Sequence, residues 1–326
     1  MIEKYFNSSI YGHCQIVQNL LKSFDRHKLI YDNSIKEAFK HETYELKKLL
    51  FLNDVDISLE QPRNKEEKTD WDNIRQIKHN RLADFVKDYT LSDWLQLFDS
   101  CKLFFAEQGR DGYNLKSNLN ELFQIVAYEN ETLYIDVLEK YLELGDPFLL
   151  NLNMSDLIRI FGKEEAFEFI KKYSFQAQET WLFNLFIAID ESKITPEDIQ
   201  TLLKLYKSAN FKNMPYHLDY LIKYCNVDEN IFLEIMAVLI SRVENEDIGF
   251  VYTFSIIFNP FTEIFKILDK YMYLDLTLFK KAYLYCLNSE NHFDHDMMAF
   301  DKLLNFDVDF VDEYIIHILN SNDKSI

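Results

Sequence analysis

Apolar residues recur along most of the chain at intervals of three and four positions, which is the period of a helix with one buried face. A clear stripe follows residue 195 and consists of Ile199, Leu202, Leu203 and Tyr206. Thr195 and Pro196 stand before it as a helix cap and a first helical residue. Residues 228–243 are apolar nearly all round, which is typical of a helix covered on both sides. We predict an all-α protein with roughly fourteen helical segments.

A second pattern recurs on a longer scale: an apolar pair, two further residues, another apolar pair and then a polar turn. It appears at 16–21, at 137–142, and at the pairs that lead into 51–56 and 305–309. Where copies adjoin, the anchor pairs stand 28 to 36 residues apart. Such a period is typical of helical hairpins stacked into a solenoid.

Two of these copies resemble ankyrin repeats. Residues 12–21 read GHCQIVQNLL, and residues 303–309 read LLNFDVD. In ankyrin repeats, the second helix reads G-H-x-x-I-V-x-x-L-L and runs into a G-A-D turn. The chain departs from the family in two ways. The T-P-L-H sequence that opens the first helix appears nowhere, and residues 51–130 and 223–260 hold no copy of the repeat. The resemblance implies an ankyrin-like helical-hairpin repeat solenoid that binds other proteins, without catalysis or cofactor. A related solenoid of another repeat type and a compact helical bundle remain alternatives.

The pattern divides the chain into three parts. Residues 1–52 are expected to form N-terminal helical repeats. Residues 53–70 are polar, contain Pro62 and are expected to form a loop or linker. Residues 71–326 are expected to form an acidic helical-repeat array. Six glycines and five prolines in 326 residues argue against many-stranded barrels and glycine-loop nucleotide folds.

The net charge of −19 is unevenly distributed. Residues 1–90 carry 15 basic and 15 acidic side chains, whereas residues 91–326 carry 20 basic and 39 acidic ones. Such a surface repels phosphate backbones and anionic membranes, so we predict neither nucleic-acid nor membrane binding. The expected partner is a protein with a basic surface. An acidic mimic of DNA, and the sensing arm of a larger switch protein, are the alternatives.

The cysteines and the hydropathy bear on location. Cys14, Cys101, Cys225 and Cys286 stand at least 61 residues apart in apolar surroundings, which predicts reduced, buried thiols and a cytoplasmic protein, or a host-cytosolic one if exported. No basic region leads into an apolar core near Met1, so no signal peptide is expected. The longest uncharged stretch is 15 residues, at 248–262. Spanning a bilayer takes about 20 apolar residues, so none is expected to span one.

Few residues suggest catalysis. Gly162-Lys163 is not a phosphate loop, because Leu157 replaces the leading glycine and Glu164 the hydroxyl residue. The densest ligand cluster is His292, Asp294, His295 and Asp296. These residues could hold a cation in a metal-dependent enzyme, but they stand in a polar break where capping and solvated residues collect. We therefore expect no enzyme, metal or cofactor.

Aromatic residues are abundant, and most are expected to fill the core. Four stand near inferred turns and are candidate contacts for a protein partner: Tyr44, Phe51, Tyr113 and Phe148. The function expected from the sequence is thus a non-catalytic protein–protein interaction module that presents an extended helical-repeat surface.

Overall fold

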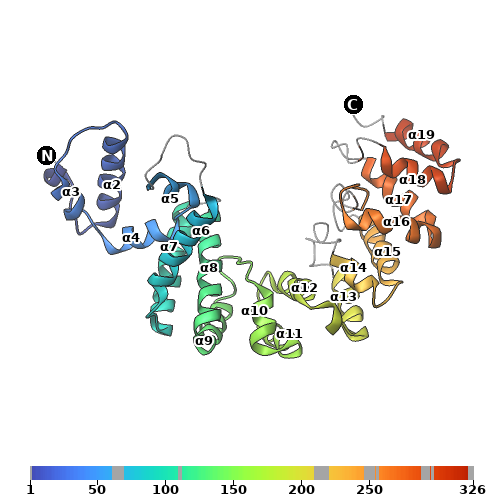
Figure 1. The fold of residues 1–326 in the computed structure, drawn as a ribbon, viewed down its shortest axis with the longest axis horizontal. Coiled ribbons are helices and arrows are strands. Elements are labelled where there is room, and N and C mark those ends of the chain that lie inside the picture. Colours follow the sequence, from blue (N-terminus) through green and yellow to red (C-terminus); the bar gives the residue numbers. More distant parts are fainter. Residues whose placement is uncertain are drawn as a thin grey trace. The chain divides into compact units, whose positions relative to one another are not determined.

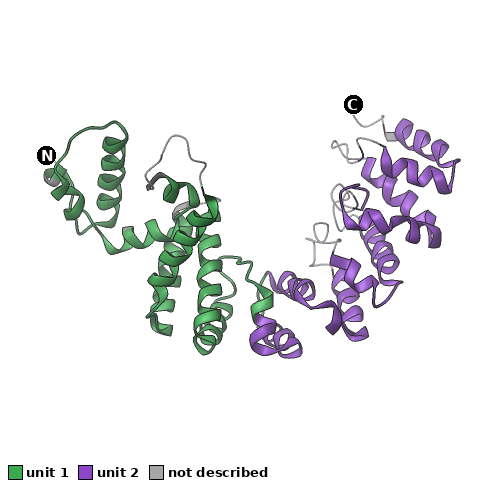
Figure 2. Ribbon diagram, viewed as in Figure 1, with its two compact units in different colours: residues 1–156, 173–176 green, residues 157–172, 177–326 purple. Residues whose placement is uncertain are grey.

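The computed structural model describes residues 2–60, 70–108, 112–208, 220–245, 254, 257–287, 294 and 297–321. Every regular element in these ranges is helical, which confirms the prediction of an all-α protein (Figure 1). The chain divides into two compact units (Figure 2). Unit 1 comprises residues 1–156 and 173–176, and unit 2 comprises residues 157–172 and 177–326. The boundaries predicted at 52 and 70 do not coincide with this division.

Unit 1 is built from helices that pack on one another. Its helices are α1 (Ile2–Tyr5), α2 (Tyr11–Arg26), α3 (Asn33–Ala38), α4 (Glu42–Leu50), α5 (Asp54–Glu60), α6 (Trp71–Val86), α7 (Leu91–Gln108), α8 (Tyr113–Glu129) and α9 (Glu131–Glu143). The helices α4, α6 and α9 pack on α8, and the others pack on these or on one another, as α7 does on α9. The rings of Trp94, Phe98 and Phe123 meet in this core at centroid distances of 5.5 to 6.1 Å. Aromatic pairs at such distances add to the stability from burial alone.

The loop predicted for residues 53–70 is wrong in its first part, because Asp54–Glu60 forms α5. The Asn53 side chain accepts a hydrogen bond from the Asp56 amide at 2.9 Å and so caps the start of the helix. Ile57 is fully buried and belongs to a small core cluster with Leu52 and Ile74. Capping and burial together make this polar stretch helical. Residues 61–69 lie outside the described residues.

Unit 2 is a succession of shorter helices. Its members are α11 (Lys163–Lys171), α12 (Gln178–Ala188), the 3-10 helix η1 (Glu191–Lys193), α13 (Pro196–Lys207), α14 (Ile222–Cys225), α15 (Ile231–Glu244), α16 (Glu263–Leu274), α17 (Leu276–Leu287), α18 (Met298–Phe306) and α19 (Phe310–Ser321). α10 (Met154–Phe161) crosses the boundary between the units. Among the described helices, none combines the length and the apolar character that a bilayer crossing needs.

One line of contacts runs through unit 2, from α13 to α15, from α15 to α17 and from α17 to α19. α15 therefore contacts two other helices of this line, but the prediction that it is covered on both sides is wrong, because Glu234, Ala237 and Ser241 form an exposed face. The buried side chains of α15 lie on the opposite half of the helix and include Ile231, Phe232, Ile235, Met236, Leu239 and Ile240. α16 and α18 contact each other and also α17. Each helix is thus covered by helices that follow or precede it at short range in the sequence.

Candidate functional site

The four aromatic residues predicted as partner contacts all lie in unit 1 and differ in exposure. Tyr113 begins α8 and is 79% exposed. Phe51 directly follows α4 and is half-buried, with its ring centroid 6.4 Å from that of Phe104. Tyr44 lies on α4, but its side chain falls outside the described ones. Phe148 is only 1% exposed, so its prediction as a surface contact is wrong.

Phe148 is buried because the turn after α9 folds inward. Gly145 and Asp146 both adopt positive φ, at 80° and 54°. The Asp146 carboxylate accepts hydrogen bonds from the Tyr141 hydroxyl and, at 3.0 Å, from the Leu150 amide. Burial raises the pKa of this carboxyl group above its usual value, although the hydrogen bonds oppose the shift. With Asp146 held inside, Phe148 packs against the Tyr141 ring at 6.0 Å.

The predicted ligand cluster contributes one described residue, Asp294; His292, His295 and Asp296 lie outside the described residues. The Asp294 carboxylate is buried and accepts hydrogen bonds from the Tyr283 hydroxyl at 3.0 Å and from the amides of Ala299 and Phe300 at 3.2 and 3.0 Å. Asp294 therefore satisfies free amides in the first turn of α18. In the described part of the chain, no three His, Cys, Asp or Glu side chains are grouped closely enough to hold a metal ion.

The thiols offer no activated nucleophile. All four cysteines are free and buried. Burial raises the pKa of Cys101 and of Cys286 far above the usual value, so both thiols stay protonated at neutral pH. A protonated thiol is a poor nucleophile and a poor metal ligand. These side chains therefore serve as small apolar core residues.

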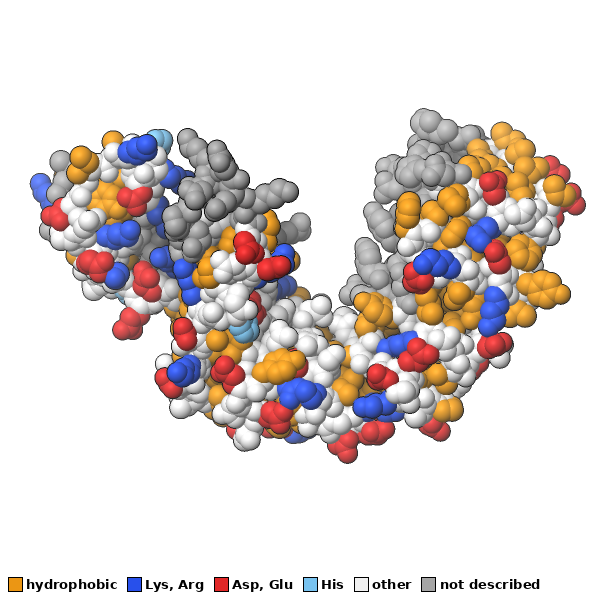
Figure 3. Space-filling model, in the orientation of Figure 1, with side chains coloured by type: hydrophobic (Ala, Val, Ile, Leu, Met, Phe, Trp, Pro, Cys, Tyr) orange, Lys and Arg blue, Asp and Glu red, His pale blue; other side chains and the backbone are white. Residues whose placement is uncertain are grey.

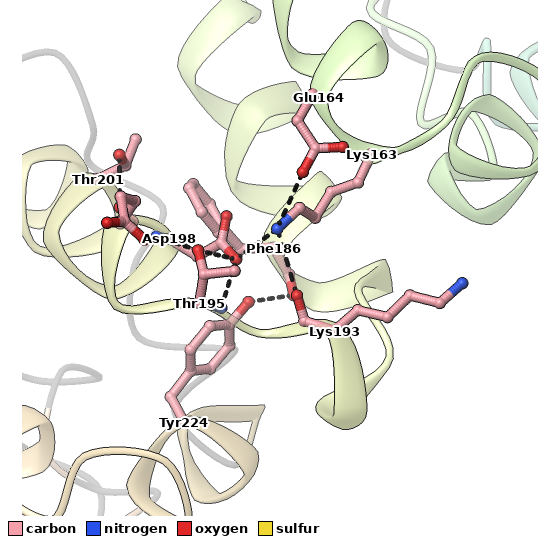
Figure 4. A network of polar contacts seen from close by, with 9 residues as sticks. Lys163, Glu164, Phe186, Lys193, Thr195, Asp198, Thr201 and Tyr224 are labelled. Carbon is pink, nitrogen blue, oxygen red and sulfur yellow. Dashed lines mark hydrogen bonds and ion pairs between the residues drawn. The ribbon is translucent and has the colours of Figure 1, made fainter.

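A buried polar network joins α11 to the start of α13 in unit 2 (Figure 4). Lys163 Nζ lies 2.9 Å from Asp198 Oδ2, and both side chains are nearly buried, with exposures of 12% and 11%. Lys163 also donates to the Lys193 carbonyl at 3.2 Å. Burial lowers the pKa of Lys163, but its hydrogen bond and attraction to Asp198 outweigh this effect and raise it. Lys163 is therefore a fixed cation and not a neutral amine available for catalysis.

The same carboxylate caps α13. The Asp198 carboxylate accepts a hydrogen bond from the Thr195 amide at 2.7 Å. In return, the Thr195 hydroxyl oxygen accepts a hydrogen bond from the Asp198 amide at 3.3 Å. This reciprocal arrangement is a capping box, and it confirms Thr195 as the helix cap. The sequence predicted the cap because its partners are three residues apart. It did not predict Lys163, which stands 35 residues away.

Other polar contacts in unit 2 join segments at nearly the same sequence separation. The Tyr224 hydroxyl donates to the Phe186 carbonyl, 38 residues away (Figure 4). Buried Arg242 donates to the Tyr206 carbonyl at 2.9 Å, 36 residues away. Lys302 pairs with Asp269 at a separation of 33 residues. An arginine inside an otherwise apolar stretch was the signal that could have identified Arg242 from the sequence.

Many described lysines of unit 2 are used in internal pairs, whereas many carboxylates are not. Lys270 pairs with Glu229 at 3.1 Å, and Lys281 pairs with Glu244. Exposed carboxylates on successive helices include Glu165, Glu197, Glu234 and Asp301. With 39 acidic and 20 basic side chains in residues 91–326, internal pairing leaves an acidic excess. A surface of this kind attracts a basic macromolecule.

Comparison of the chain with protein-family models, with curated proteins and with solved structures finds no match. A function can therefore be inferred only from the geometry, burial and charge of the described residues. Those features comprise helices joined by buried polar contacts at a recurring separation, and an exposed acidic excess.

Proposed function

We propose that the chain is a non-catalytic protein-interaction module, built as an array of helical-hairpin repeats, whose acidic surface binds a protein with a basic face. The observation that carries the proposal is the recurrence of long-range cross-helix polar contacts in unit 2 at separations that are mostly 33 to 38 residues, within a range of 27 to 41. A repeat array places equivalent side chains of neighbouring hairpins at one fixed sequence separation. Arrays of this kind offer long surfaces for macromolecular partners.

The repeat length is compatible with an ankyrin-like or related array. Ankyrin repeats have about 33 residues and other helical-hairpin repeats about 34 to 47. The residues that carry the ankyrin resemblance lie in α2 and at the end of α18. In α2, Val17 and Leu21 are buried, whereas Ile16 and Leu20 are exposed. One residue of each apolar pair thus supports the core, and the other remains available for a neighbouring element or a partner.

The acidic charge of unit 2 determines which kind of partner the module would attract. Long-range attraction between an acidic surface and a basic partner speeds encounter and weakens as salt is added. Internal lysine pairs leave the carboxylates of unit 2 in excess, so a partner that supplies lysine or arginine can neutralise them without breaking the array. Association should therefore be fast at low ionic strength and slower at high ionic strength.

The test uses the full chain as bait for lysate proteins at low and moderate salt, followed by mass spectrometry and by association rates for any stoichiometric partner. One variant reverses three exposed carboxylates of unit 2: Glu165→Lys, Glu234→Lys and Asp301→Lys. A control with the same change in net charge reverses three in unit 1: Glu42→Lys, Asp84→Lys and Asp88→Lys.

We expect the unit 2 variant to associate about tenfold more slowly and the control to change the rate much less. An association rate that salt leaves unchanged, or equal slowing in both variants, would contradict the electrostatic part of the proposal. Failure of the wild-type chain to retain any stoichiometric protein would contradict the binding function itself. Release of a retained partner by duplex DNA would instead support the alternative of an acidic DNA mimic.

A further inference from the structure

The last helix of unit 2 carries apolar side chains on two faces. One set packs inward: Phe310 is fully buried, with its ring centroid 5.8 Å from that of Phe300, and Tyr314 lies 4.6 Å from Phe300. Lys280 of α17 forms an ion pair with Glu313 of α19. These contacts hold α19 against its neighbours.

A second set points outward and defines the outer face of α19. It comprises Val311, Ile315, Ile316 and Leu319, whose exposures range from 38% to 67%, and Val308, in the turn before the helix, is 72% exposed. Val311, Ile315 and Leu319 are spaced four residues apart and so form one stripe. Figure 3 shows hydrophobic side chains gathered over α18 and α19 at the upper right of the view. Together they expose on the order of a few hundred Å², the size at which an apolar patch marks an interaction site.

The position of α19 in the line of contacts explains why this face is apolar. α15 contacts both α13 and α17, and α17 contacts both α15 and α19. Among the described helices, α19 has a neighbour of this line on one side only, namely α17. α15 and α17 each contact a following helix of the line, whereas no described helix of the line follows α19. A helix laid on this face would continue the packing seen between the earlier members.

Charge restricts what can cover the outer face. Asp312 is exposed and lies within it, since it precedes Ile315 by three residues and Ile316 by four on the same helix. A purely aliphatic cover would bury this carboxylate without a partner, at a cost of several kcal/mol. A second copy of α19 cannot supply the missing cation, because residues 308–321 contain no lysine or arginine. The occupant that fits is aliphatic and also carries a positive charge.

We infer that the outer face of α19 docks an amphipathic helix of the partner protein, with aliphatic residues along one stripe and a lysine or arginine placed to pair with Asp312. This inference rests on the proposed function and names the part of the partner that is bound. The docked helix would lie about 8–10 Å from the axis of α19, the usual distance for packed helices. Its cation would satisfy Asp312, and its aliphatic residues would cover Ile315 and Leu319.

The first experiment titrates the full chain into a fluorescein-labelled peptide of leucine and lysine, about 18 residues long, with leucine on one helical stripe. A scrambled peptide of the same composition is the control for non-specific charge attraction. The variants are Ile315→Gln and Asp312→Asn, both at exposed positions where circular dichroism should show an unchanged fold. The matched controls are Val227→Gln and Glu234→Gln, which are also exposed and lie in unit 2.

We expect Ile315→Gln to weaken peptide binding by about tenfold and Asp312→Asn by about threefold or more, with both controls within about twofold of wild type. Hydrogen exchange should show new protection at residues 308–321. Equal binding of the scrambled peptide, equal losses in the control variants, or protection elsewhere would overturn the inference. So would a concentration-dependent dimer that Ile315→Gln abolishes, because the occupant would then be a second copy.

A capture experiment separates failure of this inference from failure of the proposed function. If the wild-type chain and Ile315→Gln retain the same partner equally, docking on α19 is refuted while the binding function stands. If no lysate protein is retained but the peptide distinguishes the variants as expected, the docking face stands and the proposed function fails.

Discussion

The buried Lys163–Asp198 pair should contribute far more to stability than an exposed pair of the same geometry. Lys163 Nζ and Asp198 Oδ2 are 2.9 Å apart with side-chain exposures of 12% and 11%. Asp198→Asn would leave the Lys163 ammonium nearly buried, with the Lys193 carbonyl and the exposed Glu164 carboxylate as its remaining partners. Removing one member of a buried pair costs about 3–5 kcal/mol, and the slight exposure places this variant near about 3 kcal/mol.

A double-mutant cycle isolates the interaction from the cap that Asp198 also makes. Lys163→Met should cost about 2 kcal/mol, and the double variant about 3 kcal/mol, because it leaves no unpaired charge. The coupling energy is then about 2 kcal/mol. The matched control is Glu168→Gln on α11, which breaks the Lys171–Glu168 pair, also at 2.9 Å but with exposures of 47% and 74%. It should change stability by less than about 0.5 kcal/mol.

Hydrogen exchange measured by mass spectrometry is the assay, because an array can unfold in parts and a single melting temperature would average them. A loss of about 3 kcal/mol corresponds to roughly a hundredfold faster exchange for the amides of α13. Exchange in α13 that Asp198→Asn accelerates no more than Glu168→Gln does would refute the reasoning. A coupling energy below about 0.5 kcal/mol would refute it as well.

Phe148→Ala should lower the free energy of unfolding of unit 1 by about 3–5 kcal/mol, because the ring is fully buried. Tyr113→Ala, at an exposed position, should change it by less than about 0.5 kcal/mol. Urea denaturation measures both variants. Gly162→Ala should cost about 1–2 kcal/mol by thermal denaturation, because φ is 85° and a Cβ would approach a carboxylate oxygen at 3.0 Å. Stability should fall as pH rises above about 10, by about 1.4 kcal/mol per pH unit for each buried tyrosine. The cause is that burial raises the pKa of Tyr141 and Tyr283 in the folded state, so that the unfolded chain loses these protons first. Equal losses in the two aromatic variants, no loss at Gly162, or urea midpoints that stay level up to about pH 11 would contradict these expectations.

Local interactions made much of the fold predictable from the sequence. The apolar period predicts helices wherever one buried stripe is long enough, as in α13. The capping box at Thr195 and Asp198 could also be predicted, because both of its hydrogen bonds join residues three apart. Helix α5 was missed because its polar sequence hides the one residue that decides its packing, Ile57, whose partner Ile74 lies on another helix.

The surface was harder to predict than the helices, because exposure depends on contacts between distant residues. Phe148 stands beside a Gly-Asp-Pro turn, which favours an exposed position, but the buried Asp146 carboxylate draws the turn inward. Asp294 is a cap of α18 because Tyr283, on the preceding helix, completes its hydrogen bonds. The sequence of α19 shows apolar residues on two faces and does not reveal which of them its neighbours cover.

Stability and recognition in unit 2 are linked through its lysines. Lys163, Lys280 and Lys302 each bind a carboxylate on or beside another helix, at 2.8 to 2.9 Å, and so hold neighbouring helices together. A cation used in this way is not available at the surface, and the remaining carboxylates face solvent in excess. The outer face of α19 is the extreme case, because Asp312 lies among aliphatic side chains in a segment without lysine or arginine. A basic partner can supply that cation, and in this way the internal pairing and the choice of a basic partner have one physical origin.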